Sequence, residues 1–163
     1  MSGPKKPEGN EAFMSRVIEL SRESMNSMNG GPFAALVVHG TKIISEGTNS
    51  VTLWNDPTAH AEVVAIRRAC TALKAFQLTG CDIYSSCEPC PMCLGAIYWA
   101  RPRAIFFAGD RNDAAKAGFD DAFIYDELLV PPQKRSIPMV QMMRKQAARV
   151  LAEWKTKADK IKY

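Results

Sequence analysis

The N-terminal part of the chain carries apolar residues at helical spacing. Phe13, Val17 and Leu20 recur with the period of an α-helix that we place over residues 11–28. The sequence Asn29-Gly30-Gly31-Pro32 then ends that helix, because glycine suits a helix C-terminus and proline cannot continue a helix. The pattern therefore predicts one amphipathic helix before the first strand.

From residue 33 onward, runs typical of strands alternate with runs typical of helices. The apolar run 33–38 and the alternating run 42–46 predict a β-hairpin. Further strands are predicted over 82–86, over 104–108 (buried, by its composition) and over 137–142. Helices are predicted over 57–74, 91–99, 113–117, 121–129 and 147–159, the first with Asp56 as N-cap and Pro57 as its first residue.

This alternation predicts an α/β fold in which helices cover both faces of one sheet. In such sheets, ligands bind at the carboxyl ends of strands, beside helix N-termini. Residues 1–10 lack an apolar stretch, so we expect a flexible tail and not a signal peptide. Residues 11–163 are then expected to form a single domain.

The composition narrows the class of protein. The chain has 163 residues, a net charge of +4 and five cysteines. An odd number of cysteines in a chain of this length disfavours a secreted disulfide scaffold and favours reduced thiols in the cytoplasm. No apolar run approaches the roughly 20 residues of a membrane-spanning helix. The weak positive charge gives little support to a nucleic-acid partner.

One cluster of cysteines has the spacing of a metal site. Cys90 and Cys93 lie three residues apart at the start of the helix predicted over 91–99, so both thiols project from one face. The N-terminus of a helix favours thiolates, which are ligands for zinc. By themselves, these residues could also be small buried apolar side chains or a redox pair.

The segment His60-Ala61-Glu62 favours a metal site over these two alternatives. One histidine and two cysteines at the N-termini of two helices form a three-ligand zinc centre with the fourth position left for water. Glu62, two residues past His60, can reach that water without binding the metal. The order His-x-Glu followed by Pro-Cys-x-x-Cys is the signature of zinc deaminases that act on bases. We therefore predict His60, Cys90 and Cys93 as ligands and Glu62 as the catalytic acid and base.

The other cysteines and histidine are given smaller roles. Cys87 could be a fourth ligand, which would make the zinc structural, but Glu88 and Pro89 separate it from the helix, so we expect it beside the metal as a packing residue. His39 is expected to be solvated at the hairpin tip. Cys70 and Cys81 are expected to be core or loop residues.

The chain resembles the cytidine and nucleoside deaminase superfamily, and within it the small bacterial zinc-dependent guanine deaminases. The resemblance runs from about residue 13 to residue 163; the segment 117–121 and the final Tyr163 favour the guanine branch. Ala34 departs from the pattern, since many relatives have glycine there. This leaves the identity of the substrate base less defined. The stretches that carry the resemblance are Gly30–Phe33, Glu46–Asn49, Asn55–Glu62, Ser86–Arg101, Ala117–Asp121 and Tyr163.

The resemblance implies a cytidine-deaminase-like, three-layer αβα sandwich with a five-stranded mixed sheet. It implies a homodimer whose C-terminal segments, about residues 130–163, are exchanged, so that Asp121 and Tyr163 close the partner's pocket. It further implies one zinc ion per subunit and hydrolysis of guanine to xanthine and ammonia. The residues expected to contact the base are Asn49, Phe33, Ala61 through its N–H, Asp121 and Tyr163.

Four alternatives stay open. The same chemistry could act on isocytosine, cytosine or an ammeline-type triazine. A tRNA adenosine deaminase shares the zinc motifs, and the lysines around Trp154 could serve such a role, although a solvated terminal helix also explains them. Asp121 could simply be the N-cap of the helix over 121–129. A non-enzymatic zinc module, with Cys87 completing the ligands, would leave Glu62 without a purpose.

Overall fold

The computed structural model describes residues 7–119 and 121–161. The chain divides into two compact units, the first ending at Ala122 and the second beginning at Phe123. Of the tail expected over residues 1–10, residues 1–6 lie outside the described residues. Residues 7–10 have no regular secondary structure. Asn10 is the N-cap of the first helix, where its side chain accepts a hydrogen bond from the N–H of Ala12.

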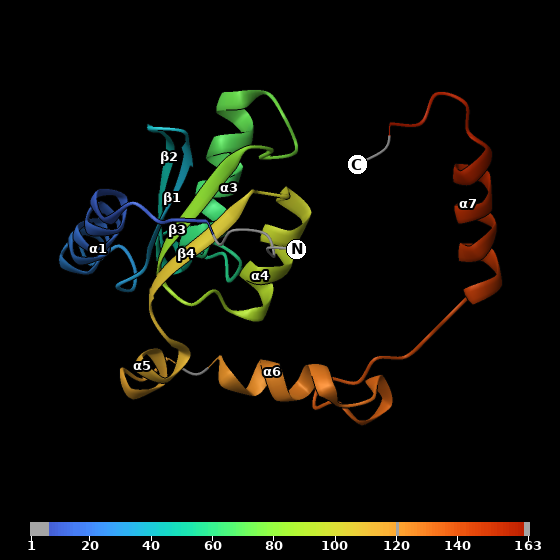
Figure 1. The fold of residues 1–163 in the computed structure, drawn as a ribbon. Helices are drawn as coiled ribbons and strands as arrows, with labels where there is room; N and C mark the ends of the chain where they lie inside the picture. Colours follow the sequence, from blue (N-terminus) through green and yellow to red (C-terminus); the bar gives the residue numbers. More distant parts are fainter. Residues whose placement is uncertain (1–6, 120, 162–163) are drawn as a thin grey trace, which may run out of the picture. The chain divides into compact units, whose positions relative to one another are not determined.

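The first unit is built on a mixed four-stranded sheet (Figure 1). Its strands are β1 (Ala34–His39), β2 (Lys42–Thr48), β3 (Cys81–Cys87) and β4 (Ala104–Gly109). The spatial order is β2-β1-β3-β4, with β1 antiparallel to both of its neighbours and β3 parallel to β4. The predicted hairpin and the next two strands are confirmed.

Helices cover both faces of this sheet, so the predicted three layers are confirmed within the first unit. Figure 1 shows α1 (Glu11–Asn26) on one side and α3 (Ala61–Leu73) and α4 (Pro91–Ala100) on the other. The alternation along β1 explains this: Leu36 packs with the α1 residues, and Val37 packs with those of α3 and α4.

The approach of α3 to β2 depends on Gly47. A Cβ atom there would lie 2.3 Å from the Ala61 carbonyl oxygen and 2.5 Å from the Ala65 nitrogen. Both are backbone atoms, so no side chain could move aside for it. The absence of a side chain at this position therefore lets the first turn of α3 lie directly on the sheet.

The predicted start of α3 was wrong. Asp56 does not begin this helix: its carboxylate accepts hydrogen bonds from the N–H and the hydroxyl of Thr58 and closes a local turn. The helix starts at Ala61, after His60. A short helix that was not predicted, α2 (Val51–Trp54), precedes the turn. An Asp-Pro pair is compatible with either a helix start or a turn, which is why the pattern misled.

The predicted strand over 137–142 was also wrong, and the described residues form four strands in place of five. A strand requires a neighbour to pair with, and Pro138 lacks the N–H that such pairing uses. β4 is consequently an edge strand of the described sheet. This explains why Phe107 is 47% exposed, although the composition of β4 predicted a buried strand.

Short helices complete the chain. In the first unit, α5 (Arg111–Lys116) follows β4. Further along are α6 (Ala122–Leu129), the 3-10 turn η1 (Pro132–Lys134) and α7 (Arg144–Thr156), none of which has a buried residue. Across residues 7–119 and 121–161, no helix has both the length and the apolar character needed to cross a bilayer.

Candidate metal centre

Two neighbouring helix starts position the predicted metal ligands. His60 is the N-cap of α3, and Cys90 is the N-cap of α4 with Pro91 as the first helical residue. Cys93 lies in the first turn of α4 and is fully buried. Because the two helices pack on the same face of the sheet, the three side chains converge from two elements.

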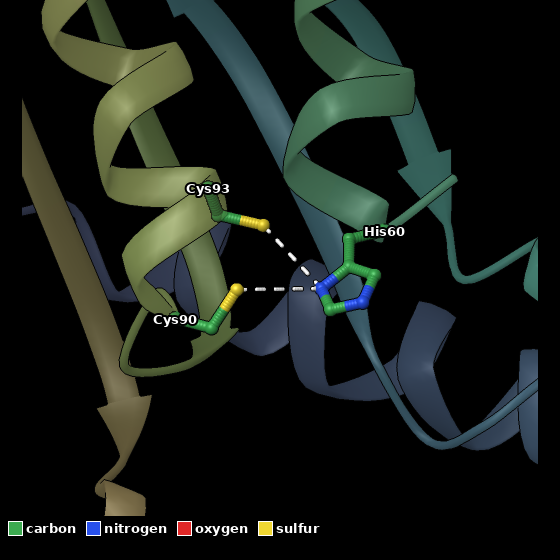
Figure 2. Close-up of side chains that lie close together, drawn as sticks. All are labelled: His60, Cys90 and Cys93. Atoms are coloured by element: carbon green, nitrogen blue, oxygen red, sulfur yellow. Dashed lines mark hydrogen bonds between the residues drawn. The ribbon is translucent and has the colours of Figure 1, made fainter. Parts of the chain in front are cut away.

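The ligand atoms are as close as a single metal ion requires. His60 Nδ1 lies 3.6 Å from Cys90 Sγ and 3.5 Å from Cys93 Sγ (Figure 2). All three atoms lie within 4.8 Å of one another. A tetrahedral zinc ion with bonds of about 2.3 Å to sulfur and 2.0 Å to nitrogen places such atoms about 3.5 Å apart. The residues present therefore fit zinc.

Cys87 does not join this group among the described residues. Its thiol lies 3.6 Å from the carbonyl oxygen of Asp110, to which it donates. Burial raises its pKa to about 11. The group of His60, Cys90 and Cys93 thus supplies three ligands, which is the number found in catalytic zinc sites.

The two ligand cysteines differ in protonation. Hydrogen bonding from Cys93, and then from His60, lowers the pKa of Cys90 to about 4 despite its burial. The hydrogen bond to Cys90, together with burial, raises the pKa of Cys93. The hydrogen bond with Cys90 also raises the pKa of His60. In the metal-free protein, the thiolate form is therefore favoured at Cys90 and the protonated form at Cys93.

Glu62 lies beside the ligands and is buried. Its Oε1 accepts a hydrogen bond of 3.1 Å from the Ser85 hydroxyl, and its Oε2 lies 3.3 Å from the Cys93 thiol. Only 7% of the residue is exposed, and burial raises the pKa of its carboxyl group. A carboxyl group with a raised pKa next to a metal site has the properties of a general acid and base.

Asp121 contributes a second acidic group. Its Oδ1 is buried and has no hydrogen-bond partner among the described residues. Burial, followed by the negative charge of Cys90, raises the pKa of this carboxyl group, while His60 and Arg111 act in the opposite direction. An unpartnered buried acceptor is costly, and a ligand that donates an N–H would satisfy it.

The other predicted contact residues lie at the neighbouring loops. Phe33 directly precedes β1, and its carbonyl accepts from the N–H of Asn49, which follows β2. Ala61 is the first residue of α3, where helix N–H groups have no partner within the helix. Tyr163 lies outside the described residues.

Two residues near the site were not predicted. Ser85 holds Glu62, but a serine in a strand gives no local signal of a partner 23 positions away. Phe119 packs edge-to-face on Phe33, with ring centroids 4.7 Å apart and an interplanar angle of 77°. Its place two residues before Asp121 was the available clue.

Comparison with known proteins places this geometry in a family. The model for the cytidine and deoxycytidylate deaminase zinc-binding region matches residues 7–109. The guanine deaminase of Bacillus subtilis (strain 168) is 52% identical over 153 residues, covering 94% of this chain and 98% of the relative. A tRNA-specific adenosine deaminase of Buchnera aphidicola is 32% identical over 124 residues, covering 76% and 79% of the two chains.

Solved structures agree with this result. The X-ray structure of guanine deaminase from Bacillus subtilis superposes with a TM-score of 0.92 at 51% sequence identity, covering 96% of this chain and 99% of that chain. The matched region includes His60, Glu62, Cys90 and Cys93, which the fold brings together. The chain belongs to the cytidine and deoxycytidylate deaminase zinc-binding family.

Proposed function

We propose that this protein is a zinc-dependent aminohydrolase that converts free guanine to xanthine and ammonia. The observation that carries the proposal is the convergence of His60, Cys90 and Cys93 beside the buried carboxyl group of Glu62. The high identity to the Bacillus subtilis guanine deaminase supports guanine as the base. The tRNA-specific relative is more distant and supports that activity less well.

The chain's own residues have distinct tasks in this reaction. His60, Cys90 and Cys93 hold the metal. When bound, zinc supplies a Lewis acid that lowers the pKa of a water molecule to about 7. Glu62 takes the proton of the attacking water on its carboxylate and delivers protons to the ring nitrogen and the departing amine of guanine. Ser85 keeps Oε1 occupied, so that Oε2 is the oxygen directed toward the ligands.

A second set of residues would recognise the base. Asp121 Oδ1, as a buried acceptor without a donor, favours a base that presents N–H groups, as guanine does. Phe33 would contact the ring face, Asn49 would hydrogen-bond the base, and the Ala61 N–H would donate to a ring acceptor. Tyr163, which belongs to the segment proposed below to be exchanged, would close the partner's pocket.

An activity panel tests the substrate. Ammonia release is measured with guanine, isocytosine, cytosine, ammeline and adenosine in a tRNA anticodon stem-loop. We expect the highest kcat/KM with guanine and loss of that preference in Asp121→Ala. A higher kcat/KM for any other member of the panel would refute guanine as the substrate.

We further propose a homodimer in which residues of about 130–163 are exchanged between subunits, with residues 11–163 forming one functional domain. The dimer is supported by exposed apolar side chains, because exposed apolar surfaces mark interfaces. On α4, Tyr98 is 76% exposed, and α7 exposes a stripe formed by Val150, Leu151 and Trp154. Light scattering of the full chain and of a chain ending at residue 130 tests this. A monomeric full chain would refute it.

A cytoplasmic location is part of the same proposal. It is supported by the five cysteines, each of which is a free thiol in the structure.

A further inference from the structure

The segment that leads to Asp121 is fastened to the loop that carries the metal ligand Cys90. Where α5 begins, the Cys87 thiol donates to the Asp110 carbonyl oxygen at 3.6 Å. The N–H of Glu88 donates to the Gly109 carbonyl oxygen at 2.8 Å. These contacts join the end of β3 to the end of β4, just before Arg111.

Arg111 makes the strongest of these connections. Its Nε lies 3.2 Å and 3.1 Å from the two carboxylate oxygens of Glu88, and a second guanidinium nitrogen also donates to that carboxylate. The main-chain N–H of Arg111 donates to Glu88 Oε2 at 3.2 Å. One carboxylate therefore accepts hydrogen bonds from both the backbone and the side chain of one residue, which fixes the orientation of that residue.

Glu88 is two residues from Cys90 and is separated from it only by Pro89, whose ring restricts the backbone. The Arg111 and Glu88 side chains are 45% and 21% exposed. Ion pairs this exposed contribute little to folding stability. The hydrogen bonds from the Arg111 side chain and backbone to Glu88, together with that of the Glu88 N–H to Gly109, set where α5 lies relative to Cys90.

Local hydrogen bonds fix the segment from α5 to Phe119, which lies two residues before Asp121. Asp110 and Asp113 form a capping box at the start of α5, each accepting from the backbone of the other. At the far end, the N–H of Phe119 donates to the Ala114 carbonyl oxygen at 3.1 Å. Gly118 has φ of +90°, a conformation that favours glycine, and turns the chain there.

We propose that Arg111 is a positioning residue for base recognition. By binding Glu88, it holds residues 110–119 at a fixed place relative to Cys90, so that the carboxyl group of Asp121 meets the base bound at the metal of the same chain. This inference rests on the proposed function, and it adds a specificity-determining pair that touches neither the metal nor the base.

The test compares Arg111→Ala with Arg103→Ala, a matched control. Arg103 makes a similar pair with Asp82, Nε to Oδ1 at 2.9 Å, between the start of β3 and the residue preceding β4. We expect Arg111→Ala to raise KM for guanine about tenfold with kcat changed less than about threefold, as small misplacements of binding groups do. Zinc content stays at one per chain. Arg111→Lys, which keeps the charge with fewer donors, is expected to be intermediate.

Two measurements do not depend on turnover. Hydrogen exchange of residues 110–119 in the metal-loaded protein without base is expected to be faster in Arg111→Ala than in the wild type or Arg103→Ala. In a Glu62→Gln background, the Kd for guanine by calorimetry is expected to rise by the same factor as KM. Unchanged exchange, or unchanged KM and Kd, would overturn the proposal, as would loss of zinc in proportion to activity.

The two proposals fail separately. If the wild type releases no ammonia from guanine, the proposed function is wrong. The exchange comparison still decides whether Arg111 holds the segment.

Discussion

The hydroxyl of Ser85 on β3 donates a hydrogen bond of 3.1 Å to Oε1 of Glu62 on α3. Both residues are buried, Ser85 with 2% and Glu62 with 7% of its surface exposed. The bond occupies the oxygen that faces the sheet and leaves Oε2 beside the Cys93 thiol. The sheet therefore orients the carboxyl group that we propose as acid and base.

Replacing the carboxyl group should separate catalysis from metal binding. In Glu62→Gln we expect kcat to fall about 10²–10⁴-fold, the usual contribution of a positioned acid–base group, with zinc content unchanged. Metal analysis and ammonia release check this together. Full turnover in a zinc-loaded Glu62→Gln protein would remove Glu62 from the mechanism.

The same substitution has a pH-dependent effect on stability. Burial raises the folded-state pKa of Glu62, so its contribution to stability is present at low pH and is lost as the pH rises through that pKa. Metal-free Glu62→Gln should therefore gain stability relative to the metal-free wild type between pH 4 and pH 7, as judged by urea unfolding. A constant difference across this range would contradict the assigned shift.

Removing the hydroxyl that holds Glu62 should have a smaller effect on rate. In Ser85→Ala we expect kcat to fall about tenfold and stability to fall by about 1 kcal/mol, the value of one buried hydrogen bond. Ser45→Ala is the control, because its hydroxyl donates to the Ala65 carbonyl oxygen, away from the ligands. Equal effects of the two substitutions on kcat would show that Ser85 has no special role.

Zinc binding should depend on pH through Cys93. Its pKa is raised, so at neutral pH it holds a proton that the metal must displace, whereas Cys90, with a pKa of about 4, is already ionised. Zinc affinity is therefore expected to increase with pH by at least about tenfold per unit, because Cys93 releases one proton and protonated His60, whose pKa is also raised, releases another. Calorimetry in buffers of different ionisation enthalpy measures the released protons. Affinity independent of pH between 6 and 8 would exclude this assignment.

The edge-to-face pair of Phe33 and Phe119 should affect binding of the base. In Phe119→Ala we expect KM for guanine to rise up to about tenfold, since such a pair is worth about 0.5–1.5 kcal/mol. Phe106→Ala is the control, because Phe106 stacks on Tyr84 on the α1 side of the sheet, at 4.8 Å between ring centroids. That substitution should lower stability and leave KM unchanged; a parallel rise in KM would indicate a general loss of structure.

The local features of the site could be predicted from the sequence. Cys90-Pro91 and the spacing to Cys93 define a helix start with two thiols on one face, and His60 and Glu62 lie within one turn of another helix start. These relationships span two or three positions, so spacing alone determines them. The continuous apolar run of β1 likewise predicts a strand that is buried on both faces, and both faces are covered by helices.

Features that depend on distant partners could not be predicted. The bond from Ser85 to Glu62 and the pair of Arg111 with Glu88 each join residues 23 positions apart. Arg111 and Glu88 are charged and partly exposed, so the pattern of hydrophobic residues does not indicate that they pair. The strand expected over 137–142 failed for the same reason, because strand formation is decided by a pairing partner and not by composition.

Gly47 limits how far the start of α3 can move relative to the sheet. With only a hydrogen atom separating β2 from the backbone of Ala61 and Ala65, the first turn of α3 has no freedom to shift toward the sheet. His60 and Glu62 flank Ala61, so their backbone positions are restricted in the same way. A methyl group at Gly47 would displace the ligand and the carboxyl group together.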